Sequence, residues 1–323
     1  MKSWSTRVLS GFCLCMSVAA QAQATEVFPV RPIRIVVPSA PGGLADLATR
    51  MVAQKMSESL GQPVVVENRA GADTMLGVRF VKSSPADGYT LLATSESVVA
   101  LPFVKQDPGY ELKDFAGIGV IARSPWLMLV GPGQPDRSVA DFVARAKARP
   151  ADMSFASGGV GTTPYLAEQM LLQRAGVQLL HVPYKGIAAA IPDVISGRVT
   201  MVFDATGSSS SKVRSGQLRA LAVTSTVRNP ALPDVPTVAE QGMPGFSSYA
   251  TIGLFAPVAT PREVVVRISG ALQAAIASRE IRERYLAEGS ETVAGTPEEF
   301  DEYLRRQSVE FGKLTSDLAL QKQ

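Results

Sequence analysis

Two glycine-containing turns, each leading into an expected helix, are the parts of this sequence best suited to chemistry. The first is Ser39–Gly43, which follows the apolar run Ile33–Val37. The second is Ser157–Thr163. Backbone N–H groups at a helix start have no partner within the helix and lie at the positive end of the helix dipole, so they bind anions. Two such turns facing one another predict a site for a small anion.

The sequence lacks the motifs of the common catalytic and cofactor sites. It has no P-loop, no H-E-x-x-H zinc motif and no G-x-S-x-G nucleophile elbow. The run Gly159–Pro164 matches a dinucleotide fingerprint only in part, because the final glycine and a well-placed acid are missing. We interpret His181, the only histidine, as a packed or hydrogen-bonded residue. We therefore predict a binding protein with no catalytic residue, no cofactor and no metal.

The first 24 residues have the pattern of a secretory signal peptide. Lys2 and Arg7 precede the apolar run Val8–Ala20, and Ala22-Gln23-Ala24 has the small residues of a cleavage site. The run is shorter than the roughly 20 residues that cross a membrane. Both cysteines lie in this segment. We expect a mature chain from Thr25, exported from the cytoplasm, with no disulfide and no thiol nucleophile.

Charge and length limit which other classes of protein and which domain organisation are possible. The net charge of the whole chain is +3, and the basic residues form no stripe or nucleic-acid-binding motif, so nucleic-acid binding is not indicated. No segment after the predicted signal peptide is long and apolar enough to cross a bilayer. The remaining length is enough for a large core and suggests two lobes.

Strand-like runs alternate with amphipathic helical stretches, a pattern typical of an α/β fold. The continuous apolar character of the runs 33–37, 64–66 and 90–94 favours parallel strands that are covered on both faces. A second unit of the same kind begins near Trp126.

Several helix boundaries can be predicted from local signals. We expect a helix from about residue 45 to residue 60, ended by Gly61. Thr163 is the expected N-cap of the helix that follows the second glycine turn. Residues 260–263 and 296–299 share the pattern Thr-Pro-x-Glu, which predicts a capping box at each of these helix starts.

Several stretches of the chain, in order from about Phe28 to the last helix, resemble one known family. They are Arg31–Pro38, the Ala-Pro-Gly-Gly turn with Asp46, Gly61–Arg69, Asp87–Leu92, Val182–Gly186, and Leu232–Thr237 with Glu240 and Gly242. They resemble the Bug (TctC-like) extracytoplasmic solute receptors of tripartite tricarboxylate transporters. The resemblance identifies a family and leaves the ligand open.

The resemblance implies an α/β, two-lobed periplasmic binding protein (Venus-flytrap) fold, with a central sheet flanked by helices in each lobe. The expected division is a signal peptide at 1–24, a first lobe of 25–125 plus 250–323, and a second lobe of 126–249. Such a protein binds a small organic carboxylate between its lobes and delivers it to a membrane transporter. Its implied partners are large and small integral membrane subunits, with a sensor kinase as a further candidate, and a monomer is expected.

The resemblance also implies which residues hold the carboxylate. In the family these are the first-lobe turn, the second-lobe helix start, the residues after Pro183 and the acid after the strand 201–203. The candidate ligand-binding residues are Ser39, Ala40, Pro41, Gly42, Gly43, Asp46, Thr94, Ser95, Ser157, Gly158, Gly159, Thr162, Thr163, Tyr184, Lys185, Gly186, Phe203 and Asp204.

Some of these residues have alternative structural interpretations. Asp46 either complements the helix dipole or contacts a ligand amino group or a water molecule. Asp204 is either exposed at the cleft rim or a cap of the next helix. Lys185 either attracts an anion or is solvated, and Tyr184 either stacks on an aromatic acid or forms part of the wall. Asp73, where family members usually have glycine and a small residue, either favours a ligand with a neutral or cationic end or is a surface turn.

Two other classes of function compete with the receptor. An exported hydrolase or lyase would use carboxylates such as Asp46 and Asp204 as an acid–base pair, but that needs a defined spacing. Sustained product formation would identify it. A sensory co-receptor would present the ligand to a signalling protein, and deleting the chain would then impair transcription rather than uptake.

Overall fold

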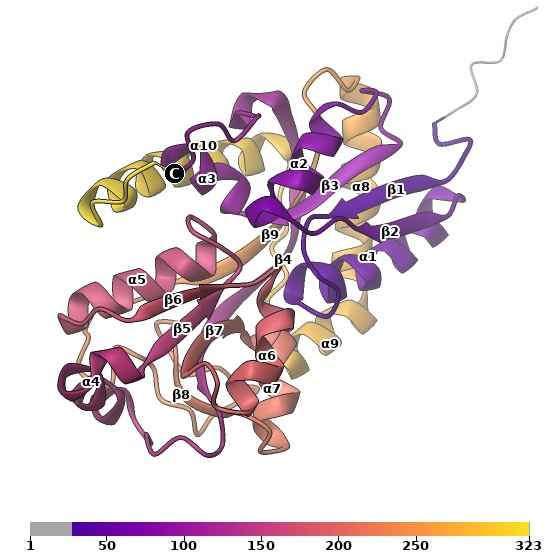
Figure 1. Cartoon of the computed structure of the whole chain (residues 1–323). Helices are drawn as coiled ribbons and strands as arrows, with labels where there is room; N and C mark the ends of the chain where they lie inside the picture. Colours follow the sequence, from indigo (N-terminus) through magenta and orange to yellow (C-terminus); the bar gives the residue numbers. More distant parts are fainter. Residues whose placement is uncertain (1–27, 323) are drawn as a thin grey trace, which may run out of the picture.

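The computed structural model describes residues 28–322, so the predicted signal peptide lies outside the described residues. The described chain forms two lobes joined by long strands (Figure 1). Its strands follow one path, β2-β1-β3-β9-β4-β7-β5-β6, and β8 pairs with β4. Helices cover the sheet in both lobes, as predicted for an α/β chain.

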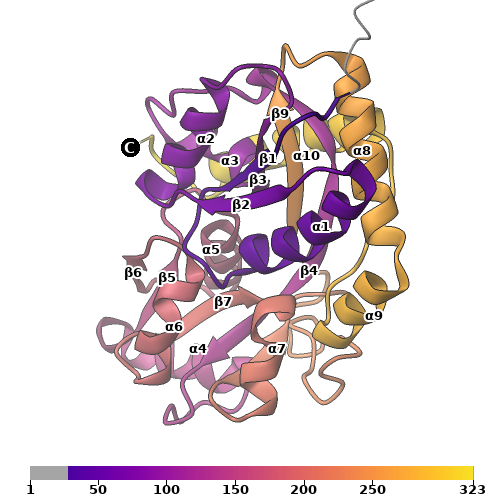
Figure 2. The same cartoon turned by 90° about the vertical axis from the view of Figure 1, so that its right-hand side faces the viewer.

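The first lobe is built on a mixed sheet with helices on both faces. Its strands are β1 (Ile33–Val37), β2 (Val64–Asn68), β3 (Thr90–Ser95), β9 (Tyr249–Pro257) and the first part of β4 (Phe115–Val130). Strand β1 is parallel to β2 and β3, whereas β9 is antiparallel to β3 and β4. One face packs on α1 (Leu44–Leu60) and α8 (Arg262–Ala277), and the other on α2 (Met75–Lys82), α3 (Ser97–Val104) and α10 (Pro297–Asp317) (Figure 2). Helix α9 (Arg279–Glu288) follows α8.

The second lobe repeats this plan on a smaller scale. Its strands are β5 (Ser154–Ser157), β6 (Leu180–Pro183), β7 (Met201–Ala205) and β8 (Arg219–Val223), and its helices are α4 (Val139–Ala148), α5 (Thr163–Ala175), α6 (Ile187–Ile195) and α7 (Thr206–Arg214). Strand β5 is parallel to β6 and β7, while β4 is antiparallel to β7 and β8. The glycine turns therefore follow the carboxyl ends of parallel strands in both lobes.

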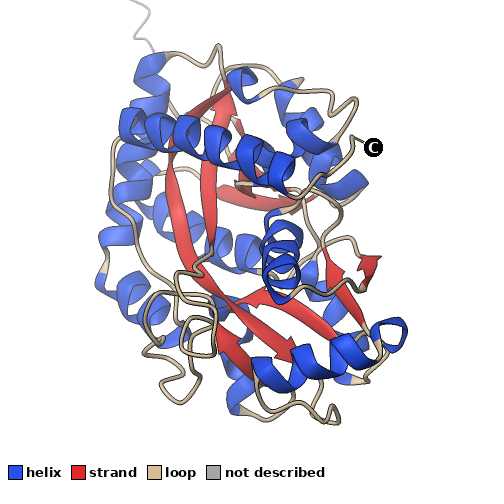
Figure 3. Ribbon diagram, turned by 90° about the vertical axis from the view of Figure 1, so that its left-hand side faces the viewer, coloured by secondary structure: helices blue, strands red, loops and turns tan. Residues whose placement is uncertain are grey.

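Strand β4 connects the lobes. Its residues 115–125 pair with β9, and its residues 126–130 pair with β7 and β8. Figure 3 shows long strands that run from one lobe into the other. The partner strand changes at Pro125, which has no N–H group to donate to a ladder. The division into residues 25–125 plus 250–323 and residues 126–249 stays a prediction, and this change of partner supports it.

The helix starts and ends agree with the sequence signals except at two places. Helix α1 ends at Gly61, whose φ is 70°, and α10 begins with the predicted capping box at residues 296–299. The N-cap of α5 is Thr162, not Thr163, because Thr162 still has an extended backbone (φ −69°, ψ 152°). The capping box predicted at residues 260–263 is absent, because Pro261 takes the N-cap position and has no side-chain oxygen to offer.

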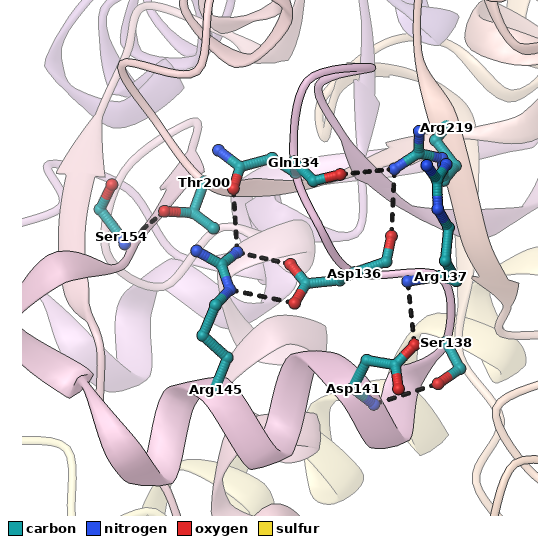
Figure 4. Close-up of polar contacts among 9 residues, drawn as sticks. All are labelled: Gln134, Asp136, Arg137, Ser138, Asp141, Arg145, Ser154, Thr200 and Arg219. Carbon is teal, nitrogen blue, oxygen red and sulfur yellow. Dashed lines mark hydrogen bonds and ion pairs between the residues drawn. The ribbon is translucent and has the colours of Figure 1, made fainter.

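A polar network ties α4 to the loop that follows β4 (Figure 4). Arg145 on α4 donates to the carboxylate of Asp136 (Nε to Oδ1, 3.0 Å) and to the side-chain oxygen of Gln134. Arg219 on β8 donates to the backbone carbonyl oxygens of Gln134 and Asp136. Asp136 is almost completely buried, so these partners offset the cost of burying its charge. The network stabilises the second lobe and contains none of the predicted site residues.

Candidate functional site

A cavity of about 90 Å³, here called the central cavity, lies between the lobes where the two glycine turns meet. The predicted site residues that line it are Ser39, Gly43, Ser95, Gly158, Thr162, Thr163, Gly186 and Asp204. A neighbouring space of about 200 Å³, here called the adjacent hollow, shares Thr74 and Gly158 with it and is also lined by Tyr184 and Lys185. The structure thus brings residues of both lobes to one place.

Five helices begin around the central cavity. The lining includes Leu44 at the start of α1, Ser97 at the start of α3, Thr163 at the start of α5, Gly186 before α6 and Ala205 before α7. Each helix dipole places partial positive charge at the helix start. Some of the N–H groups there already have acceptors, since Thr163 donates to Ser97 Oγ and Ala205 donates to Asp204 Oδ1. The helix starts and the buried carboxylate of Asp204 therefore both contribute charge to the cavity, and none of the described residues that line it is lysine or arginine.

Asp46 organises the first glycine turn and does not line the cavity. Its buried carboxylate accepts hydrogen bonds from the Gly42 N–H (2.9 Å), from Arg50 Nε (2.9 Å) and from Asn68 Nδ2 (3.0 Å). Burial alone would raise the pKa of Asp46, but the hydrogen bonds from Arg50, Gly42 and Asn68 outweigh it, so the pKa lies below its ordinary value. The Gly42 N–H is therefore occupied, and the turn presents the helix-start N–H groups that follow it.

Hydrogen bonds between the lobes use two more backbone N–H groups. The Ala40 N–H donates to the Lys185 carbonyl oxygen, and the Thr163 N–H donates to Ser97 Oγ, each at 3.0 Å. Both bonds join a residue of the first lobe to a residue of the second. The structure therefore shows the lobes in contact on two sides of the central cavity.

The second glycine turn is stabilised from inside its own lobe. Ser157 Oγ accepts a hydrogen bond from the Gly159 N–H (3.0 Å) and lies 2.7 Å from His181 Nε2. The His181 ring stacks on Phe155, with 5.0 Å between the ring centroids. Burial lowers the pKa of His181 to about 4, so the ring is neutral at pH 7. The interpretation of this histidine as a packed, hydrogen-bonded residue is confirmed.

Asp204 is buried, so the expectation of an acid exposed at the cleft rim is wrong. Its side chain is 4% exposed and accepts hydrogen bonds from the Ala205 N–H (2.9 Å), Ser208 Oγ (2.8 Å) and Ser209 Oγ (2.6 Å). Burial raises the pKa of Asp204 above its ordinary value. Asp204 is not the N-cap of α7 either, because Ala205 takes that position without a side-chain cap hydrogen bond. The hydroxyl side chains in the first turn of α7 fold back onto this carboxylate instead.

The other predicted site residues border neither space. They are Ala40, Pro41, Gly42, Asp46, Thr94, Ser157, Gly159 and Phe203. Thr94 and Phe203 each precede a lining residue, Ser95 and Asp204, on the same strand. Successive side chains of a strand point to opposite faces, so both are directed into the core instead. Tyr184 borders the adjacent hollow, and its hydroxyl donates to Asp193 at 2.6 Å.

Several lining residues were not selected from the sequence. They are Leu44, Ala45, Thr74, Ser97, Trp126, Pro164, Ile187, Ala205, Ala250 and Ile252. Most are apolar, which gives the cavity an apolar wall beside the helix starts. Ala250 and Ile252 alternate along β9, and that spacing was the available signal for them. Trp126, directly after the change of partner strand, had no comparable local signal.

Metal-binding clusters and membrane-spanning helices are both absent from residues 28–322. Among residues 28–322, no group of three or more histidine, cysteine, aspartate or glutamate side chains comes together in a way that could hold a metal ion. No helix in this range is long and apolar enough to span a membrane.

The chain is similar to known proteins along nearly all of its length. Residues 48–320 match the family described as "Tripartite tricarboxylate transporter family receptor" (TctC). The "UPF0065 protein in tcbD-tcbE intergenic region" of Pseudomonas sp. (strain P51) is 39% identical over 97% of this chain and 94% of that protein.

Two solved structures have the same fold. "Periplasmic binding protein BugD" superposes with a TM-score of 0.89 at 33% identity, covering 92% of this chain and 100% of BugD. "R. palustris Rpa4515 with adipate" superposes with a TM-score of 0.88 at 31% identity, covering 92% and 100%. The resemblance noted in the sequence and the two-lobed fold that it implied are confirmed.

Proposed function

This chain belongs to the TctC family of tripartite tricarboxylate transporter receptors, and on that premise we propose that it binds a small organic carboxylate in the central cavity. It is a solute receptor rather than an enzyme. The observation that carries the proposal is the meeting of five helix starts from both lobes around one cavity. Rpa4515, described with adipate, supports a carboxylate as the ligand class.

The energies of such a site are sufficient for useful affinity. Each helix start contributes about 0.3–1 kcal/mol to binding an anion, and up to ~2 kcal/mol when partly buried. Each hydrogen bond to a charged group adds about 1.5–3 kcal/mol. A micromolar dissociation constant requires about −8 kcal/mol. A few helix-start N–H groups on one carboxylate therefore reach this range after the cost of ordering the ligand.

We assign the ligand contacts by position. The carboxylate binds at the helix starts, and its contacts come from Ser39, Gly43, Ser95, Gly158, Thr162, Gly186 and the side chain of Thr163, whose N–H is held by Ser97. The remainder of the ligand packs on the apolar wall, which includes Trp126, Ile187 and Ile252. The predicted residues outside the cavity act indirectly, as Asp46 does when it holds the Gly42 N–H.

Binding is coupled to closure and then to transport. The lobes, residues 25–125 plus 250–323 and residues 126–249, close by bending where β4 changes its partner strand. The closed receptor delivers its ligand to the large and small membrane subunits of a tripartite transporter, which the family name supports. The periplasm is the proposed location, supported by the likeness to BugD and by the N-terminal sequence pattern.

Thermal unfolding of the chain from Thr25 against a panel of acids tests this proposal. The panel contains small monocarboxylates, dicarboxylates, citrate, acidic amino acids and aromatic acids, with the neutral amide of each acid as its control. An acid present at about 100 times its dissociation constant stabilises the protein by about 2.7 kcal/mol, which raises Tm by several degrees. The amides should give no shift. Protein freed of bound solute by unfolding and refolding that shows no shift with any acid would contradict the proposal.

A further inference from the structure

The loop Gly71–Thr74, between β2 and α2, has an unusual backbone conformation. Three successive non-glycine residues, Ala72, Asp73 and Thr74, have φ values of 48°, 52° and 79°. Positive φ is uncommon outside glycine, and such residues persist where the surrounding structure holds them. Thr74 lines the central cavity, and both Asp73 and Thr74 line the adjacent hollow. The strained loop thus borders the proposed ligand site.

The carboxylate of Asp73 fills the space above the second glycine turn. A Cβ atom built on Gly159 would lie closer than 3.0 Å to Asp73 Oδ1, a separation that real side chains essentially never show. Glycine at position 159 therefore leaves room for this carboxylate. The adjoining Gly158 lines both the central cavity and the adjacent hollow. A negative charge from the first lobe thus borders the adjacent hollow, beside the glycine turn that both spaces share.

Lys105 is the partner of this carboxylate. Its Nζ donates to Asp73 Oδ2 at 2.6 Å, and the lysine is 8% exposed. A buried ammonium group requires a negative partner, because an unpaired buried charge is strongly destabilising. Asp73 is the carboxylate within ion-pair distance of Lys105 in the described part of the chain. His181 interacts electrostatically with both Asp73 and Lys105, and it is neutral at pH 7 because burial lowers its pKa to about 4.

We propose that Asp73 takes the place beside Lys105 that a second ligand carboxylate would occupy, and so restricts the receptor to acids with a single ionised carboxylate. This inference rests on the proposed function and names the class of its ligand. The other charged residues that line the two spaces are the buried Asp204, in the central cavity, and the exposed Lys185, in the adjacent hollow. The single carboxylate of a monocarboxylate binds at the helix starts, and the uncharged end of the ligand then lies near the Asp73 carboxylate.

Isothermal titration calorimetry with matched acids tests the inference. The pairs are propionate and succinate, pentanoate and adipate, and benzoate and terephthalate, in which the second member adds one carboxylate to the skeleton of the first. The wild-type protein should bind the monocarboxylate at least tenfold more tightly in any pair that binds.

The variant Asp73→Asn separates charge from shape. Asparagine is nearly isosteric and tolerates positive φ better than most residues. It removes the negative charge and leaves the positive charge of Lys105 uncompensated, which attracts the second carboxylate. We expect the preference to move at least tenfold toward the dicarboxylate while monocarboxylate affinity stays within threefold. Adding Lys105→Met should abolish that gain. Asp87→Asn, an exposed aspartate paired with Arg31, is the control and should leave the preference unchanged.

Three results would overturn the inference. A wild-type protein that binds a dicarboxylate as tightly as its monocarboxylate partner would overturn it while leaving the proposed function intact, and so would an unchanged preference in Asp73→Asn. Failure to bind any acid would contradict the proposed function as well. If Asp73→Asn does not fold, Lys105→Met alone gives the second test. It leaves the Asp73 charge unpaired, so the preference for monocarboxylates must increase, and an unchanged preference contradicts the inference.

Discussion

Gly161 allows the two lobes to meet, and replacing it with alanine tests whether ligand binding requires this closure. Its φ is +87°, and a Cβ atom there would lie closer than 3.0 Å to Val104 Cγ2, on α3 of the first lobe. Val104 is fully buried. Its branched side chain has a strongly restricted χ1 in a helix, so it cannot rotate away. Gly161→Ala should therefore prevent the lobes from reaching the contact that the structure shows.

The substitution has two costs, which can be measured separately. A methyl group at left-handed φ costs about 1–2 kcal/mol whether the lobes are open or closed, so it lowers stability. Overpacking against Val104 costs about 1–3 kcal/mol and arises only in the closed form. Because binding includes closure, only the second cost reduces affinity, by about 5–150-fold.

The assay is isothermal titration calorimetry with the acid that gives the largest Tm shift, together with small-angle X-ray scattering of the saturated protein. Gly176→Ala is the matched control, because Gly176 has a φ of +65° and a Cβ there meets nothing within 4 Å. It should lose stability and keep its affinity within twofold. Adding Val104→Ala to Gly161→Ala removes the clashing methyl groups and should restore much of the affinity. Equal affinities of Gly161→Ala and Gly176→Ala would refute the reasoning, as would a failed rescue.

Three further substitutions test the supports of the site in urea unfolding experiments. Asp46→Ala leaves three donors without their acceptor and should cost about 1–3 kcal/mol at pH 7, since the Arg50 side chain is half exposed and can be solvated. The pKa of Asp46 is lower in the folded protein than its unfolded value of 3.8. The stabilisation by Asp46 is therefore present above pH 3.8 and is lost as the pH falls through the folded pKa. A decrease in the free energy of unfolding of less than about 1 kcal/mol at pH 7 in Asp46→Ala would contradict the role of Asp46 in holding the turn. The pKa of His181 is about 4 in the folded protein and 6.5 in the unfolded chain. The free energy of unfolding of the wild type should therefore fall by about 2 kcal/mol between pH 7 and pH 4, after discounting for partial exposure. His181→Gln should lack this pH dependence, and the same pH dependence in both proteins would exclude His181 as its source. Thr296→Ala removes the capping box of α10 and should cost about 1 kcal/mol, and an unchanged midpoint would show that the cap does not contribute.

The elements and the two turns from which the site is proposed were accessible from the sequence because their signals are local. Apolar runs predict buried strands, Gly61 at φ 70° ends α1, and the Thr296 capping box starts α10 through contacts within four residues. The two glycine turns were recognisable as candidate ligand contacts for the same reason, since a strand followed by a glycine turn and a helix places N–H groups at a sheet edge. The family resemblance implied that both turns contact the same carboxylate.

Tertiary structure decided which groups are available within that site. The Gly42 N–H is held by Asp46, and the Thr163 N–H is held by Ser97 of the other lobe, so neither assignment follows from a turn alone. The burial of Asp204 depends on how the first turn of α7 folds back. The pairing of Asp73 with Lys105 joins residues 32 positions apart. Local sequence determines backbone geometry, whereas hydrogen-bond partners, burial and contacts across the cleft depend on packing between distant segments.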